Sequence, residues 1–154
     1  MKIVVFSVGN FSIALPLYVV ERVIYIIEFN SFPNVPDFIS GYINVEGDFI
    51  PVFDPRVIFD IDKKEVELSD QLIIVKSHGL SIALWVDKVN EVKEVKQSEI
   101  VPGNELEYPD HVIEGLIKLE NGLIIISNPE RFLSKEELEK LMISIRKTGN
   151  KIKA

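Results

Sequence analysis

The tetrapeptide Ser12-Ile13-Ala14-Leu15 occurs a second time as Ser81-Ile82-Ala83-Leu84, 69 residues further along the chain. The agreement continues on both sides of it, and after an insertion of five residues in the second half it resumes at a spacing of 74. The aligned pairs include Val20 with Val89, Gly41 with Gly115, Glu46 with Glu120 and Pro55 with Pro129. Such a pattern indicates an internal repeat, so each half encodes the same supersecondary unit.

The apolar segments of each half have the length and composition of strands. β-branched residues dominate them, as in 72–75, and turn residues separate them. Gly9-Asn10 and His78-Gly79 lie at matching positions and predict tight hairpins, as do 46–48 and 120–122. With about five strands in each half, we predict an all-β chain of two small, similar five-stranded barrels.

Helix-start signals follow the last strand of each half. Asp54-Pro55 and Asn128-Pro129 each place a side-chain acceptor before a proline, which predicts a short helix. A capping box at 134–137 predicts a longer amphipathic helix over 134–148. Its apolar residues follow at helical spacing and are expected to pack on the barrels, with a partner as the alternative: Leu138, Leu141, Met142 and Ile145.

The repeat suggests one domain over 1–150 with two subdomains. Their approximate bounds are 1–68 and 69–133, and exchange of strands between the two barrels stays open. The acidic stretch 60–70 is the expected surface connection, with Asp62-Lys63-Lys64-Glu65 at its exposed tip.

Composition limits the class of protein. The 154 residues carry 17 Lys and Arg against 24 Asp and Glu, a formal charge of −7, which argues against nucleic acid as the main ligand. No cysteine is present, and no apolar run has the length of a signal-peptide core or a membrane span. We therefore expect a cytoplasmic protein without direct membrane insertion.

The residues that carry catalytic chemistry form no recognisable constellation. His78 lies in a predicted turn and His111 follows the loop Tyr108-Pro109-Asp110, so both are expected to be solvated rather than metal ligands. The carboxylates at strand ends and turns form no guaranteed pair for acid and base catalysis: Asp37, Glu46, Asp54, Asp87 and Asp110. We predict no catalytic residue, metal site or cofactor, and no enzymatic activity.

One stretch carries a family resemblance. Residues 41–56 read Gly-Tyr-Ile-Asn-Val-Glu-Gly-Asp-Phe-Ile-Pro-Val-Phe-Asp-Pro-Arg, which closely resembles the signature of CheW-like chemotaxis coupling proteins. Segments 5–9, 36–39 and 85–89 support the match in the right order, so the resemblance covers nearly the whole chain.

The resemblance implies a fold of two SH3-like barrels and a scaffolding function. Members of the family bind the cytoplasmic tip of methyl-accepting chemoreceptors and the regulatory domain of the CheA histidine kinase, in membrane-associated receptor arrays. We therefore expect a non-enzymatic chemotaxis adaptor that is recruited to such arrays.

The resemblance also implies partner-binding residues. Leu17 and Val20 match receptor-facing apolar positions, with burial in the core as the alternative. Arg56 matches the closing arginine of the signature, with a surface or ion-pairing role as the alternative. The remaining expected residues belong to the signature turn, where the glycines also serve backbone conformation: Gly41, Asn44, Val45, Glu46 and Gly47.

Two residues depart from the family pattern. Pro55 replaces leucine, which suits the first position of a helix. Glu46 stands where the family usually has arginine, and this reversal of charge predicts a partner whose charge is altered to match.

A competing function belongs to another class. A small-molecule or peptide sensor would use a cleft between the barrels, with Trp85, Tyr18 and Tyr25 as lining aromatics.

Overall fold

The computed structural model describes residues 1–106 and 111–153, and the candidate carboxylate Asp110 lies outside them. Eleven strands, two α-helices and four short 3-10 helices make up this part of the chain. The strands are β1 (Lys2–Val8), β2 (Phe11–Pro16), β3 (Val20–Tyr25), β4 (Ile39–Val45), β5 (Asp48–Phe53), β6 (Gln71–Ser77), β7 (Leu80–Val86), β8 (Lys88–Glu94), β9 (Ile100–Pro102), β10 (Gly115–Leu119) and β11 (Gly122–Ile126). The helices are α1 (Pro55–Ile58), α2 (Lys135–Lys153), η1 (Leu17–Val19), η2 (Gln97–Glu99), η3 (Gly103–Glu105) and η4 (Pro129–Arg131).

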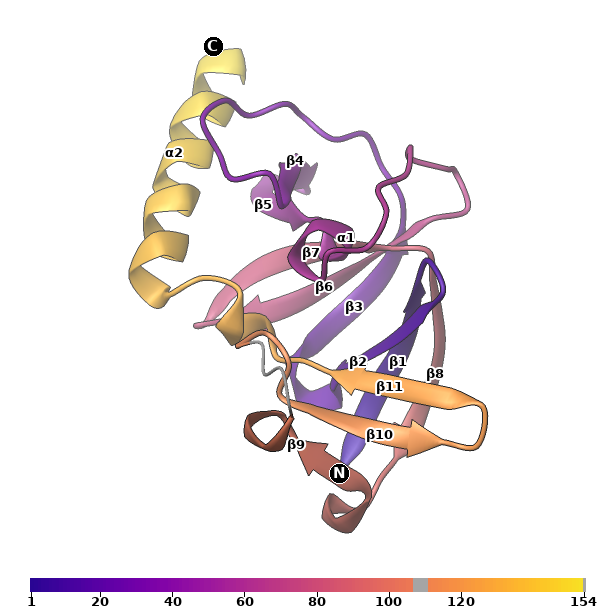
Figure 1. The fold of residues 1–154 in the computed structure, drawn as a ribbon. Coiled ribbons are helices and arrows are strands. Elements are labelled where there is room, and N and C mark those ends of the chain that lie inside the picture. The colour runs from indigo at the N-terminus through magenta and orange to yellow at the C-terminus, as the bar shows by residue number, and fades with distance from the viewer. Residues whose placement is uncertain (107–110, 154) are drawn as a thin grey trace.

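The strands form two sheets, each built from both halves of the sequence (Figure 1). The six-stranded sheet has the order β8-β1-β2-β11-β10-β9, and the five-stranded sheet has the order β3-β6-β7-β5-β4. The first hairpin of the first half, β1–β2, therefore lies in one sheet with β8 to β11 of the second half. Likewise, the first hairpin of the second half, β6–β7, lies in the other sheet with β3 to β5 of the first half. The parallel pairs β2–β11 and β5–β7 join the two contributions within each sheet. The boundary near residue 69 thus separates the two repeats and not the two sheets.

The all-β class and the repeat are confirmed, with one additional strand. Elements at matching positions take the same structure, as β1 and β6 or β5 and β11 show. The additional strand of the second half, β9, precedes the insertion and pairs with β10. Its counterpart in the first half is a single bridge between Asn30 and Tyr42.

The predicted hairpins and caps are also confirmed. Turns close at 9–10, 46–47, 78–79 and 120–121. The Asp54 carboxylate accepts a hydrogen bond from the Arg56 N–H at the start of α1, and Asn128 accepts one from the Glu130 N–H at η4.

Apolar residues form three clusters. Because successive side chains of a strand point to opposite faces, one strand can contribute to two of these clusters. Ala14 lies in the cluster of the six-stranded sheet, whereas Ile13 and Leu15 lie in the large cluster between the sheets. The five-stranded sheet encloses the third cluster, which includes Ile43, Ile74 and Trp85. Each sheet thus surrounds a core of its own and shares another.

Helix α2 packs along the five-stranded sheet beside β5 (Figure 1). The capping box is present, because Ser134 and Glu137 each accept a hydrogen bond from the other's N–H. Leu138, Met142 and Ile145 are buried. The apolar stripe therefore packs on the protein's own core as predicted, although the helix continues five residues beyond the predicted end at 148.

Candidate functional site

The β4–β5 hairpin presents the signature turn at its tip. Glu46 and Gly47 both have positive φ angles, 53° and 92°, and the Asn44 side chain accepts a hydrogen bond from the Gly47 N–H at 2.9 Å. This bond holds the turn from within the hairpin, so Asn44 has a structural role in addition to any contact with a partner. Asn44, Glu46 and Gly47 are exposed. The hairpin thus displays an ordered, charged tip.

Gly41 is buried and serves the close approach of two backbone segments. Its φ is 145°, and a Cβ atom there would lie 2.4 Å from the carbonyl oxygen of Asn30. Asn30 and Tyr42 exchange backbone hydrogen bonds at 2.8 and 3.0 Å, which ties the segment after β3 to β4. A side chain at position 41 would break this tie.

The predicted apolar contact residues are only partly available. Leu17 lies in η1 and is half-buried, and the half-buried Val20 packs against the cluster between the sheets. Val45 is half-buried and packs against the core of the five-stranded sheet. Val20 and Val45 therefore both pack against a core. For Val20, this is the alternative role that the sequence left open.

A hollow of about 480 Å³ opens beside the hairpin. Its walls come from β3, the β4–β5 hairpin, the β6–β7 hairpin and α2, and apolar side chains such as Phe49 and Met142 contribute to its lining. The charged side chains that line it are Glu21, Arg22, Asp48, Lys76 and Arg146. Gly47 belongs to this wall, so the hollow is continuous with the signature turn.

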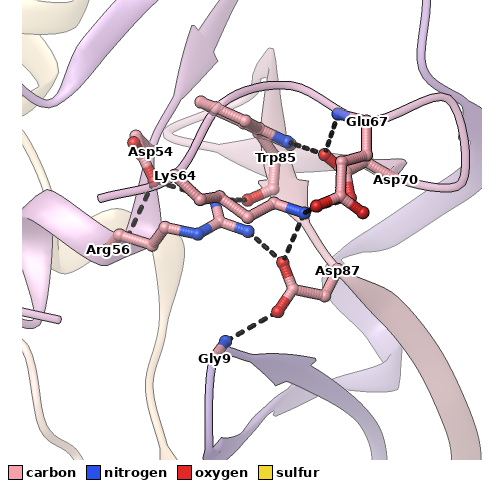
Figure 2. Close-up of polar contacts among 8 residues, drawn as sticks. All are labelled: Gly9, Asp54, Arg56, Lys64, Glu67, Asp70, Trp85 and Asp87. Carbon is pink, nitrogen blue, oxygen red and sulfur yellow. Dashed lines mark hydrogen bonds and ion pairs between the residues drawn. The ribbon is translucent and has the colours of Figure 1, made fainter. Parts of the chain in front are cut away.

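Arg56 does not lie at the surface, in contrast to one of its predicted roles. It is 1% exposed, and it lies where α1 meets the ends of β7 and β8 (Figure 2). Its guanidinium group pairs with Asp54 at 3.2 Å and with Asp87, donates to the Trp85 carbonyl oxygen at 3.4 Å, and lies 4.6 Å from the centre of the Trp85 ring. Because the side chain is buried, it cannot contact a partner directly. The predicted ion pairing is present, but within the protein interior.

Asp87 joins the two sheets through this cluster. It is the single residue between β7 of one sheet and β8 of the other. Its carboxylate pairs with Arg56 and with Lys64 at 3.3 Å, and it accepts a hydrogen bond at 2.7 Å from the N–H of Gly9 in the β1–β2 turn (Figure 2). Sequence reasoning missed this role because Asp87 and Arg56 are 31 positions apart.

Lys64 and Asp70 complete the cluster. Lys64 was expected at an exposed loop tip, but its ammonium group turns inward and lies 2.6 Å from the carboxylate of Asp70, which is 1% exposed. Burial alone would raise the pKa of Asp70, but hydrogen bonds from Lys64, the Glu67 N–H and Trp85 outweigh it and lower the pKa. Burial would lower the pKa of Lys64, and its bond to Asp70 and the nearby Asp87 raise it instead. Both groups are therefore held in their charged forms.

The histidines have different environments. His78 is not the solvated residue that its turn position predicts, because its Nε2 atom lies within 3.0 Å of the carbonyl oxygens of Glu130 and Leu133. It connects the β6–β7 hairpin to the segment before α2. His111 is exposed, and its carbonyl oxygen accepts a bond from Arg131. Among the described residues, no group of three or more His, Asp or Glu side chains could hold a metal ion.

The aromatic residues of the sensor hypothesis do not converge. Trp85 is buried, donates to Asp70 at 2.9 Å and packs edge-on against Phe29. Tyr18 and Tyr25 are 79% and 71% exposed. No feature of their arrangement favours a shared ligand cleft.

Within the described part of the chain, no helix is both long and apolar enough to cross a membrane.

Comparison with known proteins gives a consistent set of relatives. The family model of the CheW-like domain matches residues 2–137. The chemotaxis protein CheW of Bacillus subtilis is 29% identical over 137 residues, 88% of each chain, and that of Klebsiella aerogenes is 24% identical over 139 residues, 89% of this chain and 84% of the other. The solved structure of the scaffolding protein TtCheW from Thermoanaerobacter tengcongensis superposes with a TM-score of 0.74 at 34% identity, over 82% of this chain and 87% of that one.

Proposed function

The chain belongs to the CheW-like domain family, and we propose that it is a chemotaxis adaptor that couples chemoreceptors to a CheA-type histidine kinase. The observation that carries the proposal is the match over residues 2–137 together with the exposed signature hairpin. The adaptor acts by binding and not by catalysis. Its partners are the regulatory domain of the kinase and the cytoplasmic tip of methyl-accepting receptors, and these recruit it to receptor arrays in the cytoplasm.

The fold supports binding of two partners at once. The two sheets, which share one core and each have another of their own, present different edges and hairpins, and the Asp87 cluster also holds one sheet to the other. A contact on one sheet is therefore placed at a set orientation to a contact on the other. Modest individual contacts then give a strong array because many of them act together.

Calorimetric titration tests this function. The protein is titrated with the regulatory domain of the CheA-type kinase from its own genome and, separately, with a soluble receptor hairpin. Saturable binding to both is expected. Binding to neither would refute the adaptor function.

Glu46 decides the choice of partner at the hairpin tip. Because Glu46 reverses the usual charge of the family, we expect a partner with a matching basic residue. Glu46→Arg should weaken the binding of that partner by about ten-fold. Glu120→Arg is the matched control, since Glu120 occupies the same position of the repeat in the exposed β10–β11 turn. Unchanged affinity of the Glu46 variant would contradict this role.

A further inference from the structure

We propose that the hollow beside the β4–β5 hairpin receives an acidic segment of a protein partner, and that Arg146 of α2 supplies a contact charge. The inference rests on the adaptor function proposed above and adds the chemistry of one contact. It also assigns a binding role to a helix of which only the first turn lies within the family match at residues 2–137.

The hollow combines an apolar lining with a charged rim. Phe49 of β5 and Leu80 of β7, both half-buried, supply apolar surface, and the buried Ile74 and Met142 lie behind it. Arg22, Lys76 and Arg146 supply three cations, against the carboxylates of Glu21 and Asp48. A segment that presents a carboxylate beside an apolar side chain matches both parts of this surface.

One of the two carboxylates is already engaged. Glu21 lies 3.4 Å from the Lys76 ammonium group and accepts a hydrogen bond from the Ser81 hydroxyl at 2.6 Å. Within the described residues, Arg22 and Arg146 form no ion pair with an acidic side chain, whereas Lys76 pairs with Glu21. The rim of the hollow is therefore net positive in a chain whose formal charge is −7. This local reversal of charge attracts an acidic partner and disfavours a basic one.

The helix is held firmly at the position from which Arg146 reaches the rim. Gly149, one turn later, packs against the Phe49 ring so closely that a Cβ atom would lie 2.8 Å from ring carbons. Met142, one turn earlier, is buried in the cluster between the sheets. These two contacts flank Arg146 and fix the helix against the hairpin strand. Arg146 is thus presented by an ordered wall and not by a frayed end.

The hollow and the hairpin tip select different charges. Glu46 does not line the hollow, whereas its neighbours Gly47 and Asp48 do. The partner surface therefore needs a carboxylate for the hollow and a cation for Glu46. This alternation specifies register as well as affinity, because a shifted partner would place like charges together.

The test compares two neighbouring charge reversals on α2. Arg146→Glu reverses a charge at the hollow, and Lys147→Glu makes the same change at the next exposed residue, which does not line it. Each variant and the parent protein are titrated with the kinase regulatory domain and with the receptor hairpin at low and high salt, and helicity is checked by circular dichroism. Arg146→Glu should weaken one of the two interactions by about ten-fold or more at low salt, and Lys147→Glu by less than about two-fold.

The salt dependence gives a second readout. The affinity of the parent protein for that partner should fall with salt, and the affinity of Arg146→Glu should fall less because an attraction has been removed. Arg22→Glu, on the strand wall of the hollow, should act in the same direction without touching the helix. Equal effects of Arg146→Glu and Lys147→Glu on both partners would overturn the inference while leaving the adaptor function intact. Absence of binding by the parent protein to either partner would instead refute the adaptor function, and this inference with it.

Discussion

Removal of the Asp87 carboxylate should destabilise the protein strongly because it leaves Arg56 charged and buried. In Asp87→Ala the guanidinium group, 1% exposed, keeps Asp54 at 3.2 Å, the Trp85 carbonyl oxygen at 3.4 Å and the Trp85 ring at 4.6 Å from its centre. Breaking a buried ion pair by removing one partner costs about 3–5 kcal/mol. Asp54 remains as a partner and the Asp87 side chain is 26% exposed, so we expect the lower end of that range, about 3 kcal/mol.

A double-mutant cycle separates this coupling from a general loss of packing. Arg56→Met removes the other charge of the pair. The double variant Arg56→Met/Asp87→Ala removes both charges, so neither is left unpaired by the loss of the other. The double variant should lower the free energy of unfolding by less than the sum of the two single variants, and the difference should be at least about 2 kcal/mol. Lys76→Met is the control, because the Lys76–Glu21 pair is exposed and should contribute less than about 1 kcal/mol.

Urea unfolding followed by circular dichroism measures these quantities. The free energies of unfolding are obtained by linear extrapolation, and similar m-values among the variants show that the same surface is exposed on unfolding. A coupling energy below about 0.5 kcal/mol would refute the reasoning, because Arg56 and Asp87 would then contribute independently.

Two further predictions concern the glycines of the signature and the acidic centre of the buried cluster. Gly41→Ala should lower the free energy of unfolding by at least about 2 kcal/mol, because its Cβ atom would meet the Asn30 carbonyl oxygen. Gly47→Ala is the control in open space and should cost only the strain of its positive φ, about 1–2 kcal/mol, so equal losses in urea unfolding would contradict the steric argument. Asp70 has a pKa below its ordinary value in the folded state, so its contribution to stability is present above the ordinary aspartate pKa of about 3.9 and is lost as pH falls through the lower folded pKa. When the pH is lowered from about 5 to about 3, the free energy of unfolding should therefore fall more for the parent protein than for Asp70→Asn. Equal decreases would contradict a stabilising role of the Asp70 carboxylate.

The sequence by itself determined the features that depend on neighbouring residues. The four hairpin turns, the caps at Asp54 and Asn128 and the capping box at Ser134 each need only a few adjacent residues, and the structure confirms them. The repeat could also be recognised, because both copies bury the same alternating faces. The family resemblance came from residues 41–56, whose turn is likewise local.

Only the tertiary structure decided how the halves combine. A strand with apolar residues on both faces satisfies its hydrogen bonds and its packing equally well beside strands of its own repeat or of the other one. The short connections η1 and Asp87 lead β2 and β7 directly into the opposite sheet, so the first hairpin of each half pairs with the other half.

The same crossing explains why the buried cluster could not be predicted. Arg56, Lys64 and Asp87 carry ordinary surface residue types, and nothing in their spacing indicates that they meet. They meet because the chain passes from one sheet to the other at Asp87, where the start of α1 and the β1–β2 turn also lie. The burial of a charge depends on which segments converge around it, and that convergence is a property of the complete fold.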